Sequence, residues 1–82
     1  MKVTLKLARL STNMQEATLA SWYKQPGDSF LAGEPLYGVE TEKVTADVEA
    51  PCAGRLLEIL LPSGSSAEVG DQVCIIDKTD AE

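Results

Sequence analysis

The chain has 82 residues, with seven basic and thirteen acidic side chains and a formal net charge of −6. A chain this short forms one domain and buries only about 60% of the surface that its unfolded form exposes, so the core is thin. The acidic balance opposes binding to nucleic acid and to anionic membranes, because phosphate groups repel it. No apolar run approaches the roughly 20 residues that span a bilayer, and we expect neither a signal peptide nor an Arg-rich transit segment at the start. The expected partners are proteins with basic or apolar docking surfaces.

The first part of the chain predicts short strands joined by turns. Apolar and polar residues alternate over Lys2–Leu7, which is typical of a half-buried strand. Residues 9 to 16 break the alternation and are predicted to form a loop. A second strand is expected over Ala17–Lys24, and Pro26-Gly27-Asp28 ends it with a turn, since proline fixes φ and glycine allows a positive φ.

The next segment predicts a strand that climbs to a tight hairpin. We expect a very short strand at Phe30-Leu31, a turn at Gly33-Glu34-Pro35 and a strand over Leu36–Thr41. If Glu42-Lys43 form a two-residue loop, the strand that follows pairs back along this one.

That loop predicts a specific register for the hairpin. The pairs on one face would be Thr41 with Val44, Val39 with Ala46, and Tyr37 with Val48; on the other face Glu40 would oppose Thr45 and Gly38 would oppose Asp47. The apolar members then share one face, so the turn and the burial pattern agree. Lys43 would lie at the apex, where its side chain has nothing to pack against.

The second half of the sequence repeats the first. Gly27–Glu40 overlays Gly64–Asp77 at a constant offset of 37, and Val3–Leu7 overlays Val44–Val48 at an offset of 41, which leaves four extra residues in the loop of the first half. The repeat predicts an all-β fold: a flattened antiparallel barrel or sandwich of two four-stranded sheets with quasi-two-fold symmetry. The symmetry would carry the lysine hairpin onto the two chain ends. The termini should therefore lie together, away from Lys43.

Candidate catalytic groups are scarce. The chain has no histidine, and Cys52 and Cys74 are separated by a spacing that matches no zinc or redox motif, so both are predicted to be structural. Trp22 is expected to pack in or beside the core, and the glycines to serve turns or close strand approach. The turn alone leaves open whether Lys43 is only a polar surface residue or the single amine of a carrier.

The lysine turn carries a resemblance to a known family. The chain is similar, from about residue 3 to residue 77, to the lipoyl domains of 2-oxo acid dehydrogenase complexes. The residues that carry the likeness are Glu40-Thr41-Glu42-Lys43-Val44, Val48-Glu49-Ala50-Pro51, Trp22, Gly27-Asp28, Gly33, Gly54 and Gly70. The chain departs from the family pattern at Ala17, where glycine is usual, and at Glu42, where aspartate is common.

The resemblance implies a carrier with no catalysis of its own, which holds lipoate in amide linkage on Lys43. It implies that Glu42 and Val44 guide a lipoate ligase or a lipoyl/octanoyl transferase. Residues 78–82 are mostly polar and charged, and this composition predicts the start of a flexible linker or tail. The loop beside the turn would help partner recognition, through Arg9, Ser11, Asn13 and Glu16 together with Glu40.

The implied partners are a decarboxylating dehydrogenase component, an acyltransferase domain and dihydrolipoamide dehydrogenase, in a bacterial cytoplasm or a mitochondrial matrix. Two alternatives remain at this point. A biotin carrier shares the fold but usually has Met-Lys-Met at the turn, where this chain has Glu42-Lys43-Val44. An unmodified β-barrel interaction module would use Lys43 only as a surface charge.

Overall fold

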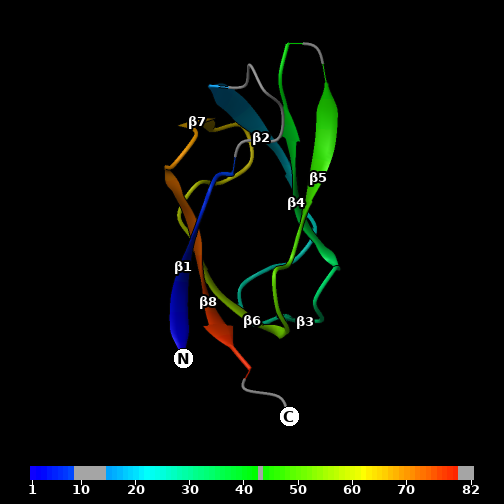
Figure 1. Ribbon diagram of the computed structural model, residues 1–82, viewed down its shortest axis with the longest axis vertical. Helices are drawn as coiled ribbons and strands as arrows, with labels where there is room; N and C mark the ends of the chain where they lie inside the picture. Colours follow the sequence, from blue (N-terminus) through cyan, green and yellow to red (C-terminus); the bar gives the residue numbers. More distant parts are fainter. Residues whose placement is uncertain (9–14, 43, 80–82) are drawn as a thin grey trace.

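The computed structural model describes residues 1–8, 15–42 and 44–79 (Figure 1), and within them it contains strands and no helix. The strands are β1 (Lys2–Lys6), β2 (Glu16–Trp22), β3 (Ser29–Phe30), β4 (Pro35–Glu40), β5 (Thr45–Glu49), β6 (Gly54–Ile59), β7 (Ser66–Glu68) and β8 (Gln72–Lys78). They form two four-stranded antiparallel sheets, in the orders β1-β8-β6-β3 and β5-β4-β2-β7. The predicted fold class is confirmed.

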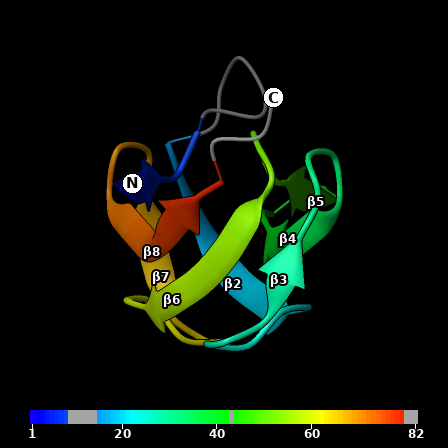
Figure 2. The ribbon, with the colours of Figure 1, turned by 90° about the horizontal axis from the view of Figure 1, so that it is seen from below.

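The two sheets enclose one apolar core. Leu19 on β2 and Leu56 on β6 have no exposed surface, and Ile76 on β8 is equally buried. Figure 2, seen from the end that carries the chain ends, shows the strands of both sheets arranged around this single interior. Trp22 is half-buried, as predicted: it packs on Tyr37 with ring centroids 4.8 Å apart, and its indole N–H donates to the carbonyl of Leu61 at 2.9 Å.

The hairpin formed by β4 and β5 has the predicted register. Val39 pairs with Ala46 and Tyr37 with Val48 on the inner face. On the other face Glu40 pairs with Thr45 and Gly38 with Asp47. Because side chains alternate along each strand, a loop of two residues was sufficient to determine which residues lie inside.

The predicted two-fold repeat is present, with one correction. The offset of 37 relates β2 to β6, β3 to β7 and β4 to β8, since Leu19 pairs with Val39 where Leu56 pairs with Ile76. The offset of 41 for the first strand is wrong: Val3 pairs with Ile76 as Ala46 pairs with Val39, which is an offset of 43. A shift by two residues keeps the same side chains inside, so alternation alone could not distinguish the two offsets. The first half therefore holds six extra residues rather than four.

The turns of the two halves repeat the same backbone hydrogen bonds. The N–H of Gly27 donates to the carbonyl of Leu56 at 2.8 Å, and that of Gly64 to the carbonyl of Leu19 at 2.7 Å. Both glycines have a positive φ, 99° and 91°, a conformation that residues with a side chain rarely adopt. These bonds tie each sheet to the other at symmetry-related corners.

Some strand ends differ from the prediction by one or two residues. The short strand is Ser29–Phe30 rather than Phe30-Leu31, because the N–H of Leu31 donates to Glu34 Oε1 at 2.7 Å and closes a turn. β8 extends through Lys78, the first residue of the expected linker, and Thr79 donates its N–H to the carbonyl of Ala53 at 3.0 Å. The rest of that linker, residues 80–82, lies outside the described residues.

The chain ends lie at the end of the domain opposite the β4–β5 turn (Figure 1), as the symmetry predicted. The Met1 ammonium donates to Asp77 Oδ1 at 2.8 Å, and the N–H of Lys78 donates to the carbonyl of Met1 at 2.8 Å. This pairing extends the β1–β8 ladder to the first residue. Under the two-fold symmetry, the paired strands β1 and β8 are therefore equivalent to β5 and β4, the two strands of the lysine hairpin.

Candidate cofactor-attachment site

The base of the β4–β5 turn is closed by Thr41 and Val44. The N–H of Thr41 donates to the carbonyl of Val44 at 2.8 Å, and the N–H of Val44 donates to Thr41 Oγ1 at 3.1 Å. The Thr41 hydroxyl also lies 3.1 Å from the Val44 carbonyl oxygen. These contacts hold the two ends of a two-residue loop. Lys43, the predicted attachment residue, lies in that loop and outside the described residues.

The residues that flank the apex face solvent. Glu42 is exposed, and 46% of the Val44 surface is accessible. Both residues predicted to guide the attachment enzyme are therefore accessible on either side of position 43.

The predicted recognition residues are placed in part. Glu16 begins β2, and Thr18, two residues further along, pairs with Glu40 at the upper end of β4. Glu16 and Glu40 therefore lie on neighbouring strands at the end of the domain that carries the turn, and Glu16 also opposes Glu68 on β7. The other predicted recognition residues, Arg9, Ser11 and Asn13, lie outside the described residues.

One contact near the turn was missed by the sequence analysis. Tyr23 follows β2, and its hydroxyl donates to Asp47 Oδ1 on β5 at 2.9 Å. This hydrogen bond, together with the negative charge of Asp47, raises the pKa of the Tyr23 phenol. The two residues are 24 positions apart, so a spacing pattern could not have linked them. The sequence did contain one signal, because the predicted register of the hairpin already pairs Asp47 with Gly38, a residue that has no side chain.

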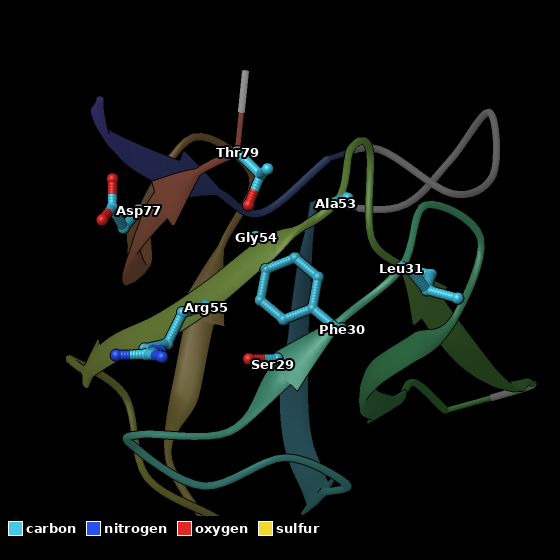
Figure 3. Close-up of a pocket in the computed structure, with 8 residues that line it drawn as sticks. All are labelled: Ser29, Phe30, Leu31, Ala53, Gly54, Arg55, Asp77 and Thr79. Atoms are coloured by element: carbon cyan, nitrogen blue, oxygen red, sulfur yellow. The ribbon is translucent and has the colours of Figure 1, made fainter. Parts of the chain in front are cut away.

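A hollow lies at the opposite end of the molecule (Figure 3), where Phe30 of β3, Arg55 of β6 and Asp77 of β8 contribute to its lining. The full lining is Ser29, Phe30, Leu31, Ala53, Gly54, Arg55, Asp77 and Thr79. These residues adjoin the chain ends, so the hollow is remote from the lysine turn.

The two cysteines were predicted to be structural, and they differ in burial. Cys52 and Cys74 are both free thiols; Cys74 is fully buried, and burial raises its pKa to about 11. Among residues 1–8, 15–42 and 44–79 no cluster of metal-ligating side chains occurs, and no helix could cross a membrane. Ala17, where the family usually has glycine, sits within β2 and pairs with Ala67, so this position requires no glycine conformation.

Comparisons with known proteins agree with this geometry. A family model described as "Biotin-requiring enzyme", the biotinyl/lipoyl attachment domain, matches residues 3–76. The succinyltransferase component of the 2-oxoglutarate dehydrogenase complex of Rickettsia conorii is 41% identical over 73 residues, which cover 89% of this chain and 18% of that protein. The corresponding protein of Bacillus subtilis is 38% identical over 74 residues, 90% of this chain and 18% of the relative. The chain thus spans about a fifth of the length of these relatives.

Two solved structures share the architecture. The lipoyl domain of the 2-oxoglutarate dehydrogenase complex from Azotobacter vinelandii superposes with a TM-score of 0.75 at 25% identity, covering 93% of this chain and 96% of that one. A single-chain, multi-domain long-chain acyl-CoA carboxylase superposes with a TM-score of 0.79 at 21% identity, covering 98% of this chain and 7% of that one. The second likeness concerns the fold alone.

The two four-stranded sheets and the exposed residues Glu42 and Val44 beside the β4–β5 turn agree with this family match, and the chain belongs to the biotinyl/lipoyl attachment family. Within that family it is a lipoyl domain, similar to those of the acyltransferase components of 2-oxo acid dehydrogenase complexes.

Proposed function

We propose that Lys43 carries lipoate in amide linkage, and that the domain moves acyl groups and reducing equivalents between the active sites of a 2-oxo acid dehydrogenase complex. The observation that supports this most directly is that Thr41 and Val44, the residues on either side of Glu42-Lys43, are held together by hydrogen bonds at the end of the β4–β5 hairpin. The relatives named above, acyltransferase components of such complexes, support the same role.

The residues around the turn suit a covalent arm. The hydrogen bonds at Thr41 hold the base of the loop, while the exposed flanks Glu42 and Val44 leave room for an enzyme to enclose the amine. A lysine amine is almost wholly protonated at neutral pH, so a lipoate ligase or a lipoyl/octanoyl transferase must remove a proton and supply the activated acyl group. Once attached, lipoate would supply a dithiolane that takes up both an acyl group and electrons.

The proposed partners follow from this role. They are a decarboxylating dehydrogenase component, an acyltransferase domain and dihydrolipoamide dehydrogenase, acting in a bacterial cytoplasm or a mitochondrial matrix. The domain itself would contribute tethering and recognition without catalysis, since tethering raises the local concentration of the arm around each active site. We propose that Glu16 and Glu40, with the segment from Arg9 onward, form the recognition surface beside the turn.

The direct test is the mass of the intact protein after coexpression with a lipoate ligase and supply of lipoate. We expect the parent chain to gain one lipoyl group and Lys43→Arg to gain none, with unchanged thermal unfolding, because an exposed substitution changes stability by less than about 0.5 kcal/mol. A gain of one biotinyl group with a biotin ligase would support the biotin alternative. A Lys43→Arg chain that is still lipoylated, for example at Lys24 or Lys78, would remove the assignment.

The position of the amine is tested by moving it one residue. In the double variant Glu42→Lys, Lys43→Glu the composition is conserved, but the lysine turns toward the other face of the hairpin. We expect lipoylation to fall severely. Modification at the parental rate would show that the attachment enzyme does not recognise position.

A further inference from the structure

Tyr23, Gly38 and Asp47 form a contact across three strands of the sheet that carries the lysine turn. The N–H of Tyr23 donates to the carbonyl of Leu36 at 2.9 Å, which fixes its backbone beside β4. Its hydroxyl reaches Asp47 Oδ1 on β5 at 2.9 Å. Since β4 lies between β2 and β5, the Tyr23 side chain crosses the middle strand. We call this hydrogen bond the clasp.

Gly38 makes room for the clasp. It pairs with Asp47, and a Cβ built on it would lie 3.3 Å from the Tyr23 hydroxyl oxygen and 3.5 Å from Asp47 Oδ1. The φ of Gly38 is not positive, so its backbone would accept other residues. A side chain would instead displace the phenol, because the first contact is tighter than ordinary van der Waals packing. The glycine is therefore explained by the space that Tyr23 needs.

The clasp holds an edge strand. β5 forms the leg of the hairpin that follows the lysine, and its ladder pairs it with β4 at one border of the sheet. An edge strand that pairs on one side opens more readily than a central one. The clasp adds a second attachment, from β5 to the residue that follows β2, and so restrains the leg next to the turn.

The two-fold symmetry provides an internal control. The positions equivalent to Tyr23, Gly38 and Asp47 are Leu60, Ile75 and Thr4, at the offsets of 37 and 43. The backbone is conserved, since Leu60 donates to the carbonyl of Val73 at 2.9 Å as Tyr23 does to that of Leu36. Leucine and isoleucine cannot form such a hydrogen bond. The sheet of β1, β8, β6 and β3 is therefore completed without a clasp, and the clasp occurs in the sheet that carries the lysine turn.

We propose that Tyr23 and Asp47 are positioning residues for the lysine turn, which hold β5 against β2 so that the turn meets the attachment enzyme in one orientation. This proposal rests on the proposed function. Because Tyr23 is half-exposed and lies below the turn, it acts through the hairpin and not by contact with the amine.

The test compares the parent with Tyr23→Phe, which removes the hydroxyl and keeps the ring. We expect the KM of the lipoate ligase for the domain to rise about three- to tenfold, the change that loss of one ordinary hydrogen bond produces, with kcat nearly unchanged. Amide exchange should accelerate at Val39 and Ala46, the pair of residues whose N–H groups bond across β4 and β5, because hydrogen-bonded pairs alternate from the Thr41–Val44 pair along the ladder. In the parent background Asp47→Asn, whose side-chain carbonyl still accepts from Tyr23, should keep the KM near the parental value, whereas Asp47→Ala should raise it as Tyr23→Phe does. Thr4→Ala, at the symmetry-related position, should leave both readouts unchanged.

The outcomes separate the two proposals. If Tyr23→Phe lowers only the melting temperature and leaves KM and exchange in the hairpin at parental values, the residue is merely structural and the inference is overturned. If no form of the chain accepts lipoate, the proposed function fails, and exchange at Val39 and Ala46 still decides whether the clasp orders the hairpin.

Discussion

The sheet that carries the lysine turn and the sheet that carries the chain ends have equivalent strands but opposite charge. Strands β5, β4, β2 and β7 contain five carboxylates, Glu16, Glu40, Asp47, Glu49 and Glu68, and no basic residue. Strands β1, β8, β6 and β3 contain four basic residues, Lys2, Lys6, Arg55 and Lys78, and two acidic ones, Glu58 and Asp77. The strands of the first sheet thus carry a net charge of −5, and those of the second sheet carry +2.

This difference shows which properties the symmetry controls. The core positions and the turns obey the two-fold repeat, since the same apolar contacts and backbone bonds are needed in both halves. The outer faces do not obey it. On those faces one sheet has the clasp and an acidic surface suited to basic partners, while the other sheet has the ion pair between Met1 and Asp77.

The largest expected effect tests the symmetry of the core. Leu19→Ala and Leu56→Ala each remove a fully buried side chain at equivalent positions. Each should lower the free energy of unfolding by about 3–5 kcal/mol, and the two values should agree within about 1 kcal/mol. Urea denaturation measures both; if either chain fails to fold, Leu19→Val and Leu56→Val give the comparison at lower cost. Clearly unequal losses of unfolding free energy would show that the two equivalent leucines do not contribute equally to the core.

An intermediate effect is expected where the symmetry is broken inside the barrel, at Ala17 and Gly54. A Cβ on Gly54 would lie 2.5 Å from the carbonyl oxygen of Asp77, so Gly54→Ala must push β6 away from β8. We expect a loss of about 2 kcal/mol from this overpacking. Ala17→Gly, the reverse change at the equivalent position, should cost about 1 kcal/mol through backbone entropy. A Gly54→Ala protein with the parental unfolding midpoint would contradict the close approach of these strands.

The smallest effect concerns the chain-end ion pair. The hydrogen bond from the Met1 ammonium, assisted by its charge, holds the pKa of Asp77 below its usual range. A lowered pKa in the folded state stabilises the fold above about pH 4, and this contribution is lost as the pH falls through the lowered pKa. Asp77→Asn should therefore melt slightly below the parent at pH 7 and together with it near pH 2.

Glu40→Gln, at the position equivalent to Asp77, is the matched control for that experiment. It neutralises a carboxylate on the other sheet without touching the chain ends. Its melting temperature relative to the parent should not follow the pH dependence of Asp77→Asn. A parallel dependence would show that the effect comes from net charge and not from the ion pair.

Several features of this domain were determined by the sequence alone. Alternation of apolar residues and the loop at Glu42-Lys43 led to the full register of the hairpin, because a two-residue loop leaves one way to pair the strands. The repeat at 37 residues led to the fold class and to the place of the chain ends. These features depend on short-range patterns, namely the alternation of apolar residues and the turn residues, which recur in each half of the sequence.

Other features were decided by the tertiary structure. The offset of the first strand is 43 and not 41, since both keep the same residues inside and pairing with β8 selects one of them. The strand at Phe30 ends before Leu31 because a side chain of the following turn takes the Leu31 N–H. The clasp depends on Tyr23 reaching across β4 over a residue that lacks a side chain. Such contacts join residues that are far apart in the chain, and these residues come within contact distance only when the sheets have formed.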